Sequence, residues 1–111
     1  MTRTAAHASV PTAYASRYLQ QLAKHWAHKF PVVFTAEVAA IDLPMGRCDL
    51  EASATVLDVT LTGTPDADMD RFRAVVAEHL QRFGHRETLI FDWRQESRNK
   101  LRYSTINGTN V

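Results

Sequence analysis

The sequence predicts an α+β fold in which two helices pack on one face of an antiparallel sheet. Three observations favour this class: a helical repeat of apolar residues over about 13–29, a strand-like alternation over 32–62, and a second helical repeat that ends at Gly84. With a final strand, the predicted order is α-β-β-β-β-α-β. Because each element has one apolar face, the helices and the sheet bury those faces against one another.

A chain of 111 residues is long enough to bury one hydrophobic core and too short for two. We therefore expect a single domain, residues 13–94. A flexible N-terminal arm, residues 1–12, precedes it, because periodicity is weak there. A flexible polar C-terminal tail, residues 95–111, follows it, because apolar residues are sparse beyond the domain.

The first helix is predicted from about Ala13 to Lys29. Thr12 or Ser16 supplies an N-cap oxygen, and Pro31 prevents the helix from continuing. The apolar residues recur at helical spacing: Ala15, Tyr18, Leu19, Leu22, Ala23 and Trp26. We expect this apolar face to pack on the sheet.

Four predicted strands follow, and they form an antiparallel meander with one face exposed to solvent. Their bounds are Val32–Phe34, Val38–Leu43, Arg47–Ser53 and Val56–Thr62. Pro44 and Gly46 mark a turn between the second and third of them. Apolar and polar residues alternate along the last two strands, so one row points to the core and the other to solvent.

The second helix is predicted to start at Pro65, with Thr64 as its N-cap, and to end at Gly84 in a left-handed conformation. Its apolar residues keep helical spacing: Met69, Phe72, Val76, Leu80 and Phe83. A last strand, Glu87–Arg94, alternates again. The sheet face away from the helices is expected to meet solvent or a second copy of the chain.

Composition and charge exclude several classes of protein. No apolar run approaches the roughly 18 residues that span a bilayer, and the N-terminus has no secretory signal, so we expect a cytoplasmic protein with no membrane contact. Residues 1–36 hold four lysines and arginines and no acid, whereas residues 37–70 hold eight acids and one arginine. This segregation predicts either a polarised surface or the simple solvation of exposed faces.

Sequence motifs identify no chemistry. The chain has no phosphate-binding glycine loop, no serine-nucleophile elbow and no cysteine–histidine ligand set, so neither a cofactor nor an enzyme class is predicted. The basic residues lack the aromatic interleaving of nucleic-acid-binding proteins, so no nucleic acid is expected. Cys48, the single cysteine, is predicted to face the core as a small apolar side chain.

His25 and His28 stand at i and i+3 in the first predicted helix, where both imidazoles reach one surface. Metal sites usually need three or four ligands, and the adjacent Lys24 and Lys29 oppose cation binding. The interpretations that stay open are a plain histidine pair, a metal site, an anion or ligand contact, and a pH-sensitive interface.

Two further polar residues have both a structural and a functional interpretation. Arg47 is predicted on the solvent-exposed face of its strand, where it pairs with Asp49 or Glu51 or, alternatively, contacts a carboxylate or phosphate ligand. His79 falls on the apolar face of the second helix and is predicted to be a core histidine with satisfied hydrogen bonds.

Several pieces of the chain, in order, resemble an uncharacterised bacterial family, the domain-of-unknown-function family numbered 2218. The pieces are Ser16–Leu19, Leu22–Lys29, Leu43–Gly46 and Val76–Trp93, so the resemblance covers about residues 14–94. A similar module stands at the N-terminus of some bacterial siderophore-interacting proteins, ahead of a flavin-binding ferric reductase domain. The resemblance therefore implies an accessory role in iron handling, without catalysis by this chain.

We thus expect a non-catalytic binding or accessory module in siderophore and iron metabolism, which forms a homodimer. The expected partner is a ferric siderophore or a siderophore reductase, and the expected ligand contacts are His25, His28, Lys29 and Arg47. Two alternatives stay open. One is a haem- or metal-binding protein, or a small enzyme, that uses His25 and His28; the other is a structural protein–protein interaction domain.

Overall fold

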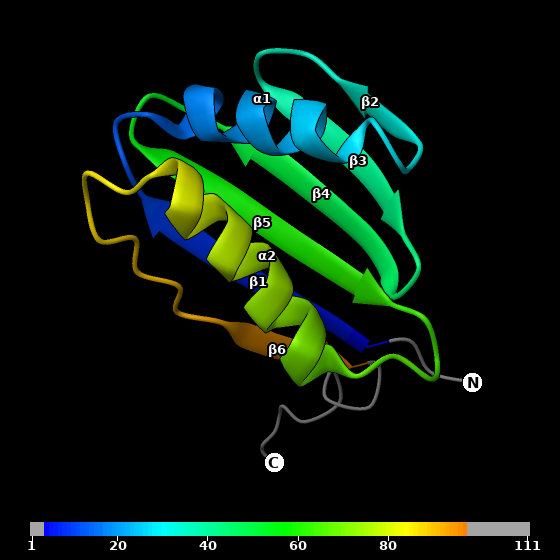
Figure 1. The fold of residues 1–111 in the computed structure, drawn as a ribbon. Coiled ribbons are helices and arrows are strands. Elements are labelled where there is room, and N and C mark those ends of the chain that lie inside the picture. Colours follow the sequence, from blue (N-terminus) through cyan, green and yellow to red (C-terminus); the bar gives the residue numbers. More distant parts are fainter. Residues whose placement is uncertain (1–3, 98–111) are drawn as a thin grey trace.

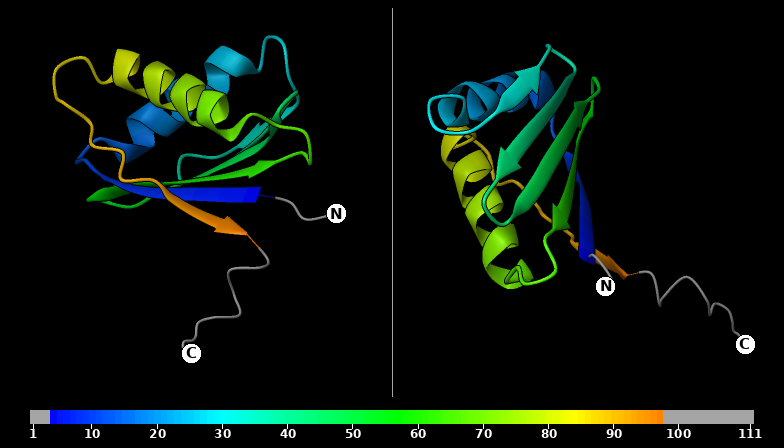
Figure 2. Two further views of the ribbon diagram at one scale, coloured as in Figure 1. Left: turned by 90° about the horizontal axis from the view of Figure 1, so that it is seen from below. Right: turned by 90° about the vertical axis from the view of Figure 1, so that its right-hand side faces the viewer.

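The structure, a computed structural model, describes residues 4–97, which form a six-stranded antiparallel sheet covered on one face by two helices (Figure 1). The elements are β1 (Thr4–Pro11), α1 (Ala15–Trp26), β2 (Val32–Phe34), β3 (Val38–Leu43), β4 (Gly46–Ala52), β5 (Val56–Gly63), α2 (Met69–Phe83) and β6 (Arg94–Ser97). The sheet order is β2-β3-β4-β5-β1-β6. The predicted α+β class is confirmed, and so is the packing of both helices on one face (Figure 2).

The N-terminal segment differs most from the sequence prediction. Residues 1–12 are predicted as a flexible arm, but Thr4–Pro11 forms β1, which lies between β5 and β6. Its core-facing residues, Ala6, Ala8 and Val10, are buried under the helices. Two of these are alanines, whose small side chains produce little contrast with their neighbours, so the alternation of this strand is weak in the sequence.

The last strand is shifted toward the C-terminus. The prediction places it at Glu87–Arg94, but β6 spans Arg94–Ser97 and pairs with β1, so residues 95–97 of the predicted tail belong to the sheet. The preceding stretch carries the buried Leu89, whose N–H donates to Gln81 Oε1 of α2 at 2.8 Å. Its alternation therefore reflects packing beside a helix. The remaining predicted tail, 98–111, and residues 1–3 of the predicted arm lie outside the described residues.

Both helices are shorter than predicted. α1 ends at Trp26 rather than Lys29, and the N–H groups of Lys29 and Phe30 donate to the Trp26 carbonyl in a following turn. α2 begins at Met69 rather than Pro65, because the Asp68 side chain, not Thr64, accepts the N–H of Arg71 and caps the helix.

Gly84 ends α2 as predicted, but with φ of −96° it is not left-handed. The reason for glycine is space, because a Cβ there would lie 3.0 Å from Cζ of Tyr18. The ring of Tyr18 thus lies against the end of α2.

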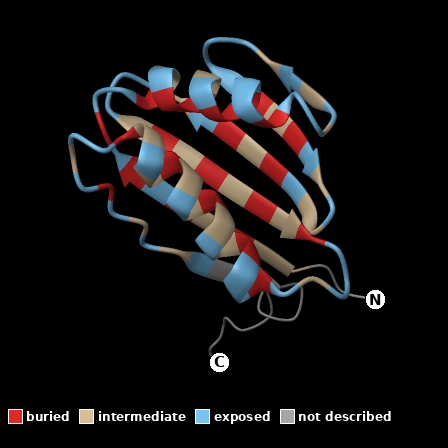
Figure 3. Ribbon diagram, viewed as in Figure 1, coloured by how far each residue is buried: buried red, intermediate tan, exposed pale blue. Residues whose placement is uncertain are grey.

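The meander β2 to β5 follows the prediction closely. β2 and β3 have the predicted bounds, and the neighbouring pairs are antiparallel with Ile41 opposite Cys48 and Cys48 opposite Leu61. Along β3, β4 and β5, buried residues alternate with more exposed ones (Figure 3), as expected for strands that have one face under the helices. Cys48 is fully buried, as predicted. No helix of the described region is long and apolar enough to span a bilayer.

Candidate functional site

Several hollows of the described surface are large enough for a small molecule, and two of them, on opposite sides of the sheet, contain the predicted ligand residues. The first, the open-face hollow, has a volume of about 610 Å³ and lies on the uncovered face of the sheet. The second, the histidine groove, has a volume of about 530 Å³ and lies where α1, α2 and the β3–β4 turn meet. Its lining is His25, Trp26, His28, Lys29, Phe30, Leu43, Pro44, Met45, Arg71, Val75 and His79.

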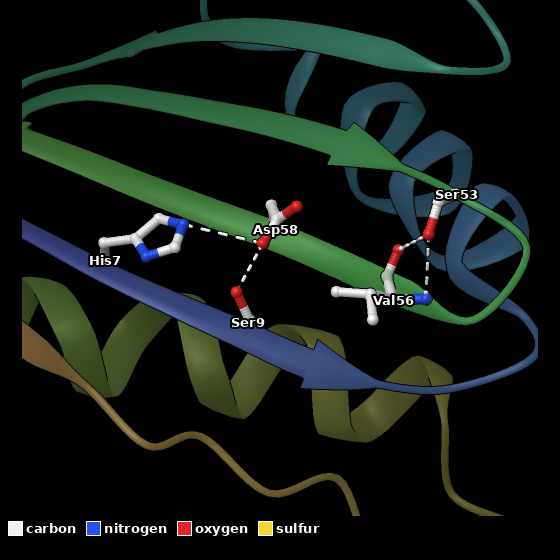
Figure 4. Close-up of polar contacts among 5 residues, drawn as sticks. All are labelled: His7, Ser9, Ser53, Val56 and Asp58. Atoms are coloured by element: carbon white, nitrogen blue, oxygen red, sulfur yellow. Dashed lines mark hydrogen bonds and ion pairs between the residues drawn. The ribbon is translucent and has the colours of Figure 1, made fainter.

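In the open-face hollow, charged side chains pair with one another. Arg47 Nε lies 2.9 Å from Asp49 Oδ1, and this carboxylate raises the pKa of Arg47. His7 Nε2 lies 3.5 Å from Asp58 Oδ1, which also accepts a hydrogen bond from Ser9 Oγ at 2.5 Å (Figure 4). Arg47 and His7 in this hollow thus each lie beside a carboxylate already.

The Ser9, His7 and Asp58 side chains do not form a nucleophilic triad. In such a triad the histidine stands between the hydroxyl and the carboxylate and accepts the hydroxyl proton. Here Ser9 donates to Asp58 Oδ1, and His7 Nε2 contacts the same oxygen rather than the serine hydroxyl (Figure 4). The arrangement therefore does not activate the serine.

The histidine groove is built by the end of α1 and the turn that follows it. Trp26 belongs to the apolar stripe of α1 and is buried, so His25, one position before it, faces the side of the helix and is exposed. The turn after Trp26 continues the helical path, and it places His28 and Lys29 beside the same groove. The predicted proximity of the two histidines thus rests on this turn.

α2 supplies the opposite wall of the groove with Arg71, Val75 and His79. The rings of His79 and His25 have centroids 5.3 Å apart, and the ring of His79 lies 5.0 Å from that of Trp26. His79 Nδ1 is 2.7 Å from the Val75 carbonyl, to which it donates, because a carbonyl oxygen only accepts.

The groove has a one-sided charge. Its described lining contains three histidines, one lysine and one arginine, and no carboxylate. The pKa of His25 is lowered by partial burial first, and then by the positive charges of His79, Arg82, His28 and Lys29. An anion in the groove would meet several positive groups at once, whereas a cation would be repelled.

The structure brings together three of the four predicted ligand residues. His25, His28 and Lys29 line the histidine groove, whereas Arg47 lies on the other face of the sheet in the open-face hollow. Arg47 has the ion pair with Asp49 that its structural interpretation predicts.

Two lining residues, Arg71 and His79, escaped the sequence reasoning as members of the site. The sequence signal that could have placed His79 in the groove is its position on the apolar face of α2, because that face packs against α1. Which residue of α1 it meets depends on how the helices cross.

The structure supports neither a cysteine nucleophile nor a metal site among the described residues. The thiol of Cys48 is fully buried, and burial raises its pKa far above the neutral range, so it is not a thiolate nucleophile. Within residues 4–97, no three histidine, cysteine, aspartate or glutamate side chains converge in a way that could hold a metal ion.

The fold and the groove define a small α+β domain that carries a basic surface groove on its helical side. The chain belongs to a family of uncharacterised proteins conserved in bacteria, DUF2218, which matches residues 7–94. It is similar to PA4090 from Pseudomonas aeruginosa, which has an NMR structure. The two chains are 35% identical in sequence, the TM-score is 0.62, and the match covers 86% of this chain and 96% of PA4090. No curated protein matches the sequence.

Proposed function

We propose that this protein is a non-catalytic binding module that takes an anionic ligand with an aromatic or apolar body in the histidine groove. The observation that carries the proposal is the lining, which combines five basic side chains with apolar and aromatic ones and has no carboxylate among its described residues. Lysine, arginine and protonated histidine form charge-assisted hydrogen bonds with anions. Trp26, Phe30 and Met45 supply contact area for an apolar body.

The class of ligand that we propose is a ferric siderophore, in an accessory role in iron metabolism. Ferric complexes of catecholates carry net negative charge and aromatic rings, which matches both halves of the groove. The resemblance of the chain to the N-terminal module of siderophore-interacting proteins supports the same class. The volume of about 530 Å³ admits part of such a complex and leaves the rest in solvent.

Calorimetric titration with two ferric complexes tests the proposal. Ferric tris(2,3-dihydroxybenzoate) is anionic and aromatic, and ferric tris(acetohydroxamate) is neutral and has no rings. We expect the first to bind and the second not to bind. Binding of neither complex, or of both equally, would contradict a ferric-siderophore ligand recognised by charge and aromatic surface.

Variants connect the affinity to the groove. His28→Ala combined with Lys29→Ala removes two of the basic groups, and we expect about a tenfold or larger loss of affinity for the anionic complex. Arg47→Ala is the matched control, because it removes an exposed positive charge on the opposite face of the sheet. Equal losses in both variants would indicate non-specific attraction to the net charge of the protein.

A further inference from the structure

Two histidines from different helices face each other in the histidine groove. His25 comes from the last turn of α1 and His79 from the middle of α2, and their ring centroids are 5.3 Å apart. Aromatic rings hold the pair in place, because His25 also lies 5.9 Å from the ring of Phe83 and His79 lies 5.0 Å from that of Trp26. The pair therefore forms a defined part of the groove.

The hydrogen bond of His79 determines where this ring can take a proton. Its Nδ1 donates to the Val75 carbonyl at 2.7 Å, so the neutral ring has its hydrogen on Nδ1. Nε2 is then the nitrogen that binds an incoming proton. A doubly protonated pair would place two positive rings about 5 Å apart, which is unfavourable unless a negative charge accompanies them.

Among the described residues, the charged groups that line the groove beside the pair are all basic. The α1 side and its turn contribute His28 and Lys29, and α2 contributes Arg71 and Arg82. The third wall, the β3–β4 turn, contributes Leu43, Pro44 and Met45, which do not titrate. Without a carboxylate in the described lining, a ligand is the available source of negative charge.

We propose that His25 and His79 couple anion binding to proton uptake, so that the groove binds its ligand together with a proton from solvent and holds it more tightly as the pH falls. This inference rests on the proposed function, because it assigns a regulation to the same groove. An anion whose charge does not change near neutral pH, such as a sulfonate, isolates this coupling, because any proton that is taken up on binding then belongs to the protein. An imidazole nitrogen of the pair takes up the proton from solvent and gains an N–H bond, while the ligand itself is not changed chemically.

The probe that tests this coupling is 2-naphthalenesulfonate, which combines an aromatic body with a fixed negative charge. Calorimetry at about pH 7.5 and about pH 5.5 brackets the titration of histidine. We expect the affinity to be about five- to tenfold higher at the lower pH. Repeating the titrations at an intermediate pH in two buffers of different ionisation enthalpy measures the protons taken up, and we expect net uptake. The neutral analogue 2-naphthalenemethanol is expected to show no such pH dependence.

Substitutions of His25 and His79 test whether these two histidines take up the proton. His25→Gln and His79→Gln keep a polar side chain of similar size but cannot take up a proton near neutral pH. In each variant we expect the ratio of the affinities at pH 5.5 and pH 7.5 to fall toward one, whatever the affinity at pH 7.5. His85→Gln is the control, since this histidine is exposed after α2 and does not line the groove. Circular dichroism of each variant establishes that it is folded, and His25→Gln, at an exposed position, keeps the test available if His79→Gln does not fold.

The outcomes separate the two proposals. Sulfonate binding with the same affinity at both pH values, or pH dependence that persists in both variants, would overturn the proton coupling and leave the anion-binding groove in place. If the sulfonate binds at neither pH, both the coupling and the anion-binding groove are overturned. Proton uptake that His25→Gln and His79→Gln each reduce, and that His85→Gln preserves, supports the coupling.

Discussion

At the scale of single residues, Tyr18 joins α1 to the segment that follows α2. Its hydroxyl donates to Glu87 Oε2 at 2.6 Å, and Thr12 Oγ1 donates to the same oxygen at 2.8 Å. Burial, and then the neighbouring Glu87, raise the pKa of Tyr18, so its hydroxyl keeps its proton at neutral pH. This carboxylate thus connects α1, the end of β1 and the last part of the domain.

Tyr18→Phe is expected to lower the free energy of unfolding by about 1–2 kcal/mol, because the Glu87 carboxylate loses a hydrogen-bond donor in a partly buried place. Urea unfolding followed by circular dichroism measures the loss. Tyr14→Phe is the matched control, since Tyr14 is 55% exposed and removal of its hydroxyl should change stability little. Equal effects of the two substitutions would contradict a role for the Glu87 contact.

A second residue-scale prediction concerns Gly46, the first residue of β4 after the turn from β3. Its φ of +147° is one that residues with a side chain rarely adopt, and a Cβ there would clash with the Thr62 carbonyl of β5. Gly46→Ala is therefore expected to destabilise the protein by about 2–3 kcal/mol or more. Thermal unfolding checks this, with Thr55→Ala in the exposed β4–β5 turn as control. Similar midpoints for the two variants would show that the turn relaxes easily.

At the scale of elements, the sequence prediction and the structure differ most over β1, which is predicted as a flexible arm and forms a strand in the structure. As a flexible arm it would tolerate a charge anywhere, but as an interior strand it has one buried and one open face. Ala8 points into the core at 1% exposure, whereas Ala5 is half-buried on the open face. The two alanines thus provide a test within one strand.

Ala8→Lys is expected to prevent folding or to cost several kcal/mol, because it buries a charge without a partner. Ala5→Lys is expected to leave the fold intact, since its side chain reaches solvent. Circular dichroism and the dispersion of amide signals in NMR spectra distinguish the two. If both variants fold equally well, β1 is not an interior strand of the sheet in solution.

At the scale of the whole molecule, the charge segregation of the sequence becomes a difference between faces. Asp49, Glu51 and Asp58 line the open-face hollow, whereas the histidine groove on the helical side has basic residues alone among its described charged lining. The fold therefore separates an acidic sheet face from a basic groove. This polarity bears on the homodimer that the sequence predicts.

The homodimer stays a prediction, and the charges on the open face of the sheet predict how its association depends on salt. If two copies meet through that face, acidic residues of both approach each other, while the apolar Val33, which is 77% exposed, becomes covered. We expect a dimer whose association strengthens as salt rises to about 0.5 M, because salt screens like charges. Sedimentation equilibrium measures this, and Val33→Asp should weaken it. A monomer under all conditions would contradict the prediction.

Part of the candidate site could be read from the sequence because it is local. His25, His28 and Lys29 lie within one helical turn of each other, so their proximity follows from helix geometry. His79 reaches them through the crossing of α1 and α2, and no local pattern reports that crossing. Arg47 shows the opposite case, since its pairing with Asp49 is local and was predicted, while its separation from the histidines depends on the sheet between them.

The sequence by itself determined the elements with strong periodic contrast: two helices with apolar stripes, the alternating strands between them, and the α+β class that follows. Only the tertiary structure decided that Thr4–Pro11 is an interior strand and that Arg94–Ser97 pairs beside it. The physical reason is that β1 finds its partners some 50 and 90 residues away, so its stability comes from long-range pairing and burial that local side-chain patterns do not encode.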